Sequence, residues 1–256
     1  MARRATIIKA TRSESADPVL VLDAGSALYG RPLAMQTEGR IIVEAMNALG
    51  YDAMAVGAKD LHWGADVLVQ RAGEADFPIL SCNIVSSDEG SLILPPYAIL
   101  ERAGLVFGIL GVTEPEARDA VRTGREKIEI LDPVDSVGKY LSEVEGQSDV
   151  VVLLSHLGLE EDLGLALALP EVDIIVGGRS KVLMREPELV GNTIIVQAGY
   201  SGEWIGRVQV GFDQQGRVLG AESEFITLSP DVGDDAELKA LVDEYKRLYP
   251  TPTPQS

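Results

Sequence analysis

The chain has 256 residues, of which 46% are hydrophobic, an ordinary composition for a globular protein of one large or two small domains. The formal net charge of −18 argues against nucleic acid or an anionic membrane surface as a partner, because both attract clustered Lys and Arg. No apolar run reaches the ~18 residues of a membrane helix, and the N-terminus lacks the apolar core of a signal peptide. We therefore expect a cytoplasmic protein, or an exported or anchored one if the chain was trimmed from a longer precursor.

Short apolar runs alternate with helical patterns from residue 19 onward. The runs are rich in Val, Ile and Leu, as expected for strands that are buried on both faces. They cover residues 19–23, 52–56, 77–81, 105–112, 149–155 and 172–178. Amphipathic segments lie at 37–50, 132–146 and 159–170, and Gly50 has the position of a helix C′ residue. This alternation predicts βαβ units.

The pattern changes near residue 192, where crossover helices no longer fit between the apolar runs. Residues 192–200, 203–213 and 218–228 predict an antiparallel meander, with a hairpin turn at 213–216. We predict one domain over residues 1–230, with two stacked sheets and helices outside. A C-terminal helix at 231–249 and a Pro/Thr tail at 250–256, which resembles a linker or an unstructured end, complete the chain.

Seven phrases in the sequence resemble, in order, one known family. They are VLDAGSALYGRPLA, NALGYDAMAVGAKDLHWG, FPILSCNI, GILGVTEPE, VVVLLSHLGLEEDLGLA, PEVDIIVGGRSK and NTIIVQAGYSGEWIGRVQVGFD. Over about residues 3–230 the chain resembles the N-terminal domain of the bacterial 5′-nucleotidase group of calcineurin-like metallophosphoesterases. The resemblance implies a four-layer α/β/β/α sandwich with mixed sheets. It also implies a site where two divalent metals activate a water molecule and clamp a phosphate.

The motifs that hold the metals in that family are altered in this chain. Ser26 replaces the bridging Asp of A-G-D, and Gly57-Ala58-Lys59-Asp60 replaces G-N-H-E. Arg179 and Lys181 replace two imidazoles of G-G-H-S-H, so only His156 of the S-H motif and, less closely, Asp60 match. A divalent ion needs several converging O or N donors. We therefore expect no metal cofactor; an active enzyme would need Mn, Zn, Fe or Mg.

The first strand of the family, which carries D-x-H, has no counterpart in this sequence. The segment ARRATIIKATR resembles the helix that follows that strand; a weaker alternative places a displaced strand at ATIIKA. An unpaired sheet edge invites pairing. We therefore expect a second copy of the chain or a protein partner to fill this edge by strand addition, unless the N-terminal segment itself does so.

The altered positions leave two interpretations open. If Lys59, Arg179 and Lys181 converge beside Ser26, they would bind phosphate, sulfate or a carboxylate through charge-assisted hydrogen bonds. Alternatively, these cations pair with carboxylates such as Asp23, or point into solvent.

Three further side chains are candidates for chemistry. His156 is either a remnant acid/base or a packed residue at a strand end. His62 is expected in a loop beside Trp63, with a metal site shared by His62 and His156 as the alternative. Cys82, the single cysteine, is expected to be a small buried hydrophobe.

The leading hypothesis is a catalytically degenerate 5′-nucleotidase-like domain that acts as a binding or protein-interaction module. The alternative is a metal-dependent phosphoesterase, of the 5′-nucleotidase type, with a reduced or rearranged site. Bound metal separates the two hypotheses, because only the enzyme requires it.

Overall fold

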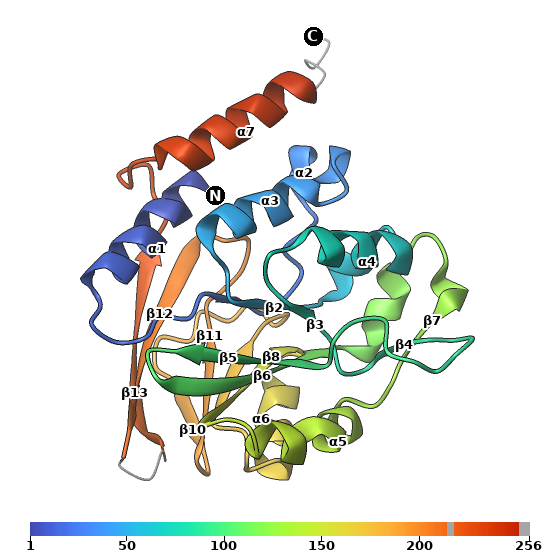
Figure 1. Cartoon of the computed structure of the whole chain (residues 1–256), viewed down its shortest axis with the longest axis vertical. Coiled ribbons are helices and arrows are strands. Elements are labelled where there is room, and N and C mark those ends of the chain that lie inside the picture. The colour runs from blue at the N-terminus through green and yellow to red at the C-terminus, as the bar shows by residue number, and fades with distance from the viewer. Residues whose placement is uncertain (214–217, 251–256) are drawn as a thin grey trace.

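The computed structural model describes residues 1–213 and 218–250 (Figure 1). The predicted α/β/β/α sandwich with mixed sheets is confirmed: a smaller parallel sheet is stacked on a larger sheet whose two edge strands are antiparallel to their neighbours. The smaller sheet has the order β1 (Leu22–Asp23), β2 (Ala53–Ala55) and β3 (Ile79–Leu80). The larger has the order β10 (Glu188–Val190), β11 (Thr193–Gln197), β9 (Ile174–Gly177), β8 (Val150–His156), β6 (Leu105–Thr113) and β5 (Tyr97–Arg102).

Helices cover the outer face of each sheet. The smaller sheet shares one hydrophobic cluster with α1 (Ala2–Glu14), α3 (Arg40–Leu49), α4 (Ala65–Glu74) and α7 (Ala236–Leu248). The larger sheet shares another with α5 (Pro133–Glu145) and α6 (Leu159–Ala168). Shorter elements are α2 (Pro32–Gln36), η1 (Ala58–Leu61), η2 (Pro115–Ala120), η3 (Arg125–Lys127), β4 (Ile84–Ser86) and β7 (Ile128–Ile130). In the part of the chain described, we found no helix with the length and hydropathy of a membrane span.

Two elements agree closely with the sequence patterns that predict them. Every residue of β8 is buried, which explains its continuous apolar run. Helix α3 ends at Gly50, whose φ of 63° is left-handed, as the C′ prediction requires.

The predicted meander is wrong in its first strand. β11 pairs in parallel with β9 inside the larger sheet, because all five of its residues are buried and need cover on both faces. Only β12 (Trp204–Phe212) and β13 (Val218–Thr227) form an antiparallel pair. The hairpin turn predicted at 213–216 and the tail predicted at 250–256 lie mostly outside the described residues.

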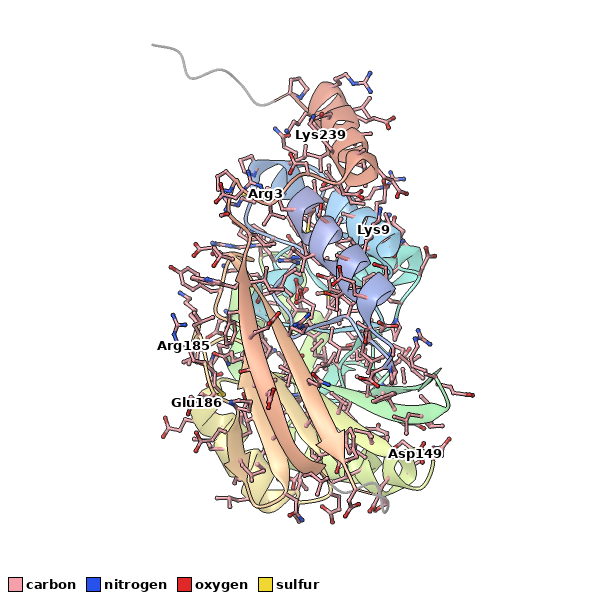
Figure 2. The ribbon with its side chains drawn as sticks, turned by 90° about the vertical axis from the view of Figure 1, so that its left-hand side faces the viewer. Arg3, Lys9, Asp149, Arg185, Glu186 and Lys239 are labelled. Atoms are coloured by element: carbon pink, nitrogen blue, oxygen red, sulfur yellow. The ribbon has the colours of Figure 1, made fainter. Side chains whose placement is uncertain are left out.

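The N-terminal segment is helix α1, so the alternative of a displaced strand at ATIIKA is wrong. Lys9 of α1 forms ion pairs with Asp235 and Glu237 at the start of α7, at 2.8 and 3.0 Å. The side chain of Asp235 also caps α7 by accepting a hydrogen bond from the Leu238 N–H. Figure 2 shows Arg3 and Lys9 on α1 beside α7, which carries Lys239. The two terminal helices thus stabilise each other.

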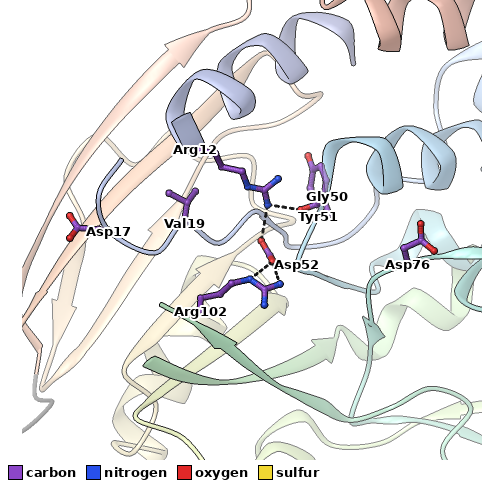
Figure 3. A pocket seen from close by; sticks show the side chains of 8 residues that line it. All are labelled: Arg12, Asp17, Val19, Gly50, Tyr51, Asp52, Asp76 and Arg102. Carbon is purple, nitrogen blue, oxygen red and sulfur yellow. Dashed lines mark hydrogen bonds and ion pairs between the residues drawn. The ribbon is translucent and has the colours of Figure 1, made fainter. Parts of the chain in front are cut away.

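A buried carboxylate ties α1 to both sheets (Figure 3). Asp52, whose side chain is 2% exposed, accepts hydrogen bonds from Arg12 of α1 at 3.1 Å and from Arg102 of β5 at 2.6 Å. It also accepts one from the backbone N–H of Val21, at 2.7 Å, just before β1. Asp52 therefore positions the start of β1 and the end of α1 together.

We predict that Asp52→Ala lowers the free energy of unfolding by about 1–3 kcal/mol, because the hydrogen bonds that its buried carboxylate accepts from Arg12, Arg102 and Val21 are lost. Urea denaturation measures this change. The matched control is Asp66→Ala, which breaks an exposed ion pair with Lys127 and should have a much smaller effect. An equal decrease in the free energy of unfolding in the two variants would contradict the predicted stabilising role of Asp52.

Candidate functional site

Four loops meet at the carboxyl ends of β1, β2, β8 and β9, around the side chain of His156. A Cβ added to Gly57 would lie 2.6 Å from both His156 Cδ2 and Ser26 Oγ. A Cβ added to Gly178 would lie 3.1 Å from His156 Cδ2 and from the carbonyl oxygen of Ala24. Glycine is therefore required where these loops approach the imidazole. Of the predicted site residues, Ser26, Asp60 and His156 lie together here.

Both carboxylate oxygens of Asp60 accept hydrogen bonds from the backbone. Oδ2 accepts from the N–H groups of Ser26 and Gly57, at 2.6 and 2.9 Å, and Oδ1 accepts from Leu28, at 2.8 Å. The residue is 1% exposed. Burial raises the pKa of Asp60 to about 6, although the three N–H donors act in the opposite direction. Asp60 thus joins the loop after β1 to the loop after β2.

His156 is buried and paired with Glu114, a residue that the sequence analysis missed. Its Nδ1 lies 2.8 Å from Glu114 Oε2, and Glu114 Oε1 accepts a hydrogen bond from the Ala58 N–H at 3.2 Å. Burial lowers the pKa of His156, but the hydrogen bond and charge of Glu114, together with the charges of Asp60 and Asp23, act in the opposite direction, and the net shift is upward. The only signal for Glu114 was its position in GVTEPE, at the end of an apolar strand.

The three predicted cations have separate surroundings. Arg179 donates a hydrogen bond to the Leu157 carbonyl at 2.7 Å and forms an ion pair with Glu116 at 3.3 Å. The ammonium of Lys181 lies 5.9 Å from the centroid of the Tyr200 ring. The Lys59 backbone N–H donates to Ser26 Oγ at 3.3 Å, and the residue is exposed. Arg179 thus pairs with a carboxylate, as the second of the two interpretations predicts. The convergence of all three cations stays a prediction.

The loops keep an unusual backbone at the altered positions. Ser26, Arg179 and Lys181 have φ angles of 62°, 63° and 60°, in the left-handed region. They are three of the six such non-glycine residues in the described chain. This conformation costs of order 1 kcal/mol or more per residue and clusters at functional sites. The site therefore has a specific loop geometry at the altered positions.

The donor set does not fit a divalent metal. Ser26, Lys59, Arg179 and Lys181 supply no carboxylate or imidazole, and the Asp60 oxygens are already bonded. Across residues 1–213 and 218–250 no group of three or more His, Cys, Asp or Glu residues is arranged to hold an ion.

His62 and Cys82 have the surroundings predicted for a loop residue and a buried hydrophobe. The His62 ring lies 4.3 Å from that of Tyr29 and 5.4 Å from that of Trp63, between centroids. Cys82 is buried, and burial raises the pKa of its thiol to about 12. A thiol that stays protonated near neutral pH is a poor nucleophile.

A second buried acid lies behind His156, and the sequence analysis missed it as well. The hydroxyl of Ser155 donates a hydrogen bond to Asp162 Oδ1, while Asp162 Oδ2 is buried with no partner in the described chain. Burial raises the pKa of Asp162 to about 7, with Ser155 acting in the opposite direction. Asp162 therefore keeps its proton in the folded state well above the pH at which an unfolded chain releases it.

This difference predicts a pH dependence of stability. Between about pH 4 and 7 the unfolded state loses the Asp162 proton and the folded state keeps it, so stability falls as the pH rises. Asp162→Asn should remove this component, which amounts to roughly 4 kcal/mol across the window. Denaturant unfolding from pH 4 to 8 measures it, with Glu160→Gln, a change of an exposed side chain on the same helix, as the control. Parallel curves for wild type and Asp162→Asn would contradict the prediction.

A second prediction concerns the Glu114–His156 pair. Glu114→Gln should lower the pKa of His156, because the amide keeps a hydrogen-bonding group but removes the negative charge. Imidazole chemical shifts measured against pH would show this directly. An unchanged His156 titration would mean that the pair does not set its pKa.

No family model matches the chain. A snake venom 5′-nucleotidase of Gloydius brevicauda is 31% identical over 271 residues, which cover 96% of this chain and 46% of the relative. The crystal structure of a 5′-nucleotidase precursor from Thermus thermophilus superposes with a TM-score of 0.88 at 30% identity, over 96% of this chain and 52% of that one. The calcineurin-like phosphoesterase YfkN of Bacillus subtilis has the same fold, with a TM-score of 0.83 at 20% identity, over 97% of this chain and 88% of that one.

These findings confirm the predicted resemblance in both sequence and fold. The chain spans about half the length of the snake venom and Thermus proteins. The site, at the carboxyl ends of the strands, is where the altered motifs of the resemblance come together. The chain thus has the metallophosphoesterase-type N-terminal domain of the 5′-nucleotidase family.

Proposed function

We propose that this domain acts by binding and does not hydrolyse phosphate esters with a metal pair. The observation that carries the proposal is the chemistry of the donor set. Both carboxylate oxygens of Asp60 already accept hydrogen bonds from backbone N–H groups. Two cations, Arg179 and Lys181, and one hydroxyl, Ser26, stand at positions where the family motifs have metal ligands. Converging anionic or imidazole donors are needed to hold two such ions.

A metal-dependent phosphoesterase is the second candidate, and the relatives favour it. The snake venom and Thermus proteins are named 5′-nucleotidases, and YfkN of Bacillus subtilis is named a trifunctional nucleotide phosphoesterase. In this chain, the paired His156 and Glu114 are the one acid–base arrangement at the strand ends that would serve such an enzyme. His156 Nε2 would remain available for a proton or an ion after Nδ1 has bonded Glu114.

Metal content and hydrolysis separate these candidates. Protein purified without chelator should contain far less than one equivalent of Mn, Zn or Fe by elemental analysis. It should not hydrolyse AMP or bis-(p-nitrophenyl) phosphate with added Mn, Zn or Mg, at rates above those of His156→Ala. Two ions per chain, together with activity that His156→Ala abolishes, would establish the enzyme in place of the binding module.

An anion is the small ligand that this site would take. The support is the cationic substitution pattern at Lys59, Arg179 and Lys181, together with the left-handed loops that present two of these residues. Fixed positive charge would bind phosphate or sulfate through charge-assisted hydrogen bonds. Arg179 would have to exchange its ion pair with Glu116 for the anion.

Phosphate should therefore raise the thermal unfolding temperature of the wild type. Mass action gives about 2.7 kcal/mol of stabilisation at a hundredfold excess over Kd. Arg179→Gln should reduce this effect, whereas Arg207→Gln, which removes an exposed arginine paired with Glu224 on the β12–β13 hairpin, should leave it unchanged. The absence of stabilisation at millimolar phosphate would end the anion proposal without affecting the metal result.

Two cellular locations, the cytoplasm and the exterior of the cell, are candidates for this protein. The sequence favours the cytoplasm for the chain as given, whereas the relatives named for snake venom are proteins of a secretion. Fractionation of cells that express the full gene would decide between the two.

A further inference from the structure

The loop that follows β9 is closed over the end of β11. Gly177, the last residue of β9, pairs in register with Gln197, the last residue of β11. Both parallel strands therefore end at the same level of the sheet, and the loop at residues 178–182 begins beside Gln197. The far end of the loop returns to the same place, because the Val182 carbonyl accepts a hydrogen bond from the Gly199 N–H at 2.8 Å. The loop is thus fixed at both ends to β11 and the residues just after it.

The side-chain amide of Gln197 lies under this loop and is bonded through both of its polar atoms. The residue is 2% exposed. Its Oε1 accepts hydrogen bonds from Ser180 Oγ at 2.7 Å and from the Val182 N–H at 2.8 Å. Its Nε2 donates to the Gly178 carbonyl at 2.8 Å. Because a backbone N–H can only donate and a carbonyl can only accept, an amide satisfies both partners at once, whereas a carboxylate or an apolar side chain does not.

The bonds to Gln197 enclose two left-handed residues. The Gly178 carbonyl also accepts from the Ser180 N–H at 2.7 Å, across Arg179, whose φ is 63°. Such a bond around a residue of positive φ is the classic γ-turn, which is rare and strained. Lys181 has a φ of 60°, and the residues before and after it both donate to Gln197 Oε1. The amide thus holds each strained residue from both sides.

Strained backbone persists only where its surroundings over-determine it. Among the residues that the structure describes, Gln197 is the one side chain from outside the loop that bonds the loop backbone. The backbone conformation in turn sets the direction in which a side chain leaves the chain. At its present φ, Arg179 reaches the carbonyl of Leu157, the residue after His156, at 2.7 Å. The conformation held by Gln197 is therefore the one that brings Arg179 beside the site.

We propose that Gln197 is a positioning residue of the anion site, because it holds Arg179 and Lys181 in the left-handed conformation and so directs both cationic side chains. Gln197 acts through the loop and does not itself contact the anion. The inference rests on the proposed function for its ligand, inorganic phosphate or sulfate. The conformation that it assigns to the loop can be tested without any anion, so the two can fail separately.

Glycine and alanine at position 181 report the backbone conformation in the absence of ligand. Alanine is disfavoured at positive φ, whereas at negative φ it is preferred, because glycine loses more conformational entropy on folding. With Gln197 present, Lys181→Gly should therefore unfold at a higher urea concentration than Lys181→Ala. Gln197→Met removes all three bonds with an unbranched side chain. In that background the preference for glycine should be lost.

Phosphate measures the consequence for the ligand. The rise in thermal unfolding temperature that phosphate gives the wild type should fall several-fold in Gln197→Met. The matched control is Thr193→Val on the same strand, which removes the buried hydrogen bond from Thr193 Oγ1 to the Val172 carbonyl. This control should be less stable than the wild type and should keep the full phosphate effect.

A milder variant keeps the proposal testable if Gln197→Met does not fold. Ser180→Ala changes an exposed residue and removes one of the two donors to Gln197 Oε1. It should reduce both the phosphate effect and the preference for glycine at position 181, in the same direction as Gln197→Met.

Two results would overturn the proposal. The first is an undiminished preference for glycine at position 181 after the amide has been removed. The second is a phosphate effect in Gln197→Met as large as that in Thr193→Val. A wild type that phosphate does not stabilise would instead overturn the anion proposal, and with it the binding role of Gln197, while the glycine and alanine variants would still show whether Gln197 sets the conformation of the loop.

Discussion

The shape of this site depends on the hydrogen bonds that the buried carboxylate of Asp60 accepts from the backbone. Three backbone N–H groups, from Ser26, Leu28 and Gly57, converge on its two oxygens. Buried N–H groups must be bonded, and a carboxylate satisfies several at once. Asp60 thereby holds the loop after β1 and the loop after β2 together. Asp60 has become a structural residue at a place where the family resemblance led us to look for chemistry.

The remainder of the site is arranged around this clamp. Gly57 presents no side chain, which lets His156 and Ser26 approach the loop closely. Glu114 bonds both His156 and the N–H of Ala58, so the imidazole is fixed to the same loop that Asp60 holds. The left-handed backbone at Arg179 is kept although its side chain turns to Leu157 and Glu116.

At the other end of the strands, Asp52 has the corresponding role. It joins α1, the approach to β1 and the edge strand β5 through Arg12, Val21 and Arg102. The same buried carboxylate therefore ties α1 to both sheets.

The sequence by itself determined the fold class and most of the framework. Continuous apolar runs such as Val150–His156 predict buried strands, and Gly50 ends its helix, because burial and backbone conformation are local properties of a pattern. Ordered motifs identified the family, and residue identities alone led to the prediction that its metal-ligand positions are altered. The tertiary structure decided which strands pair, and this placed β11 in the larger sheet. It also decided the partners of polar groups, since Glu114 and His156 are 42 residues apart in the chain. Such long-range contacts leave no periodic trace in a single sequence, because they depend on where the strands stop and which loops meet there.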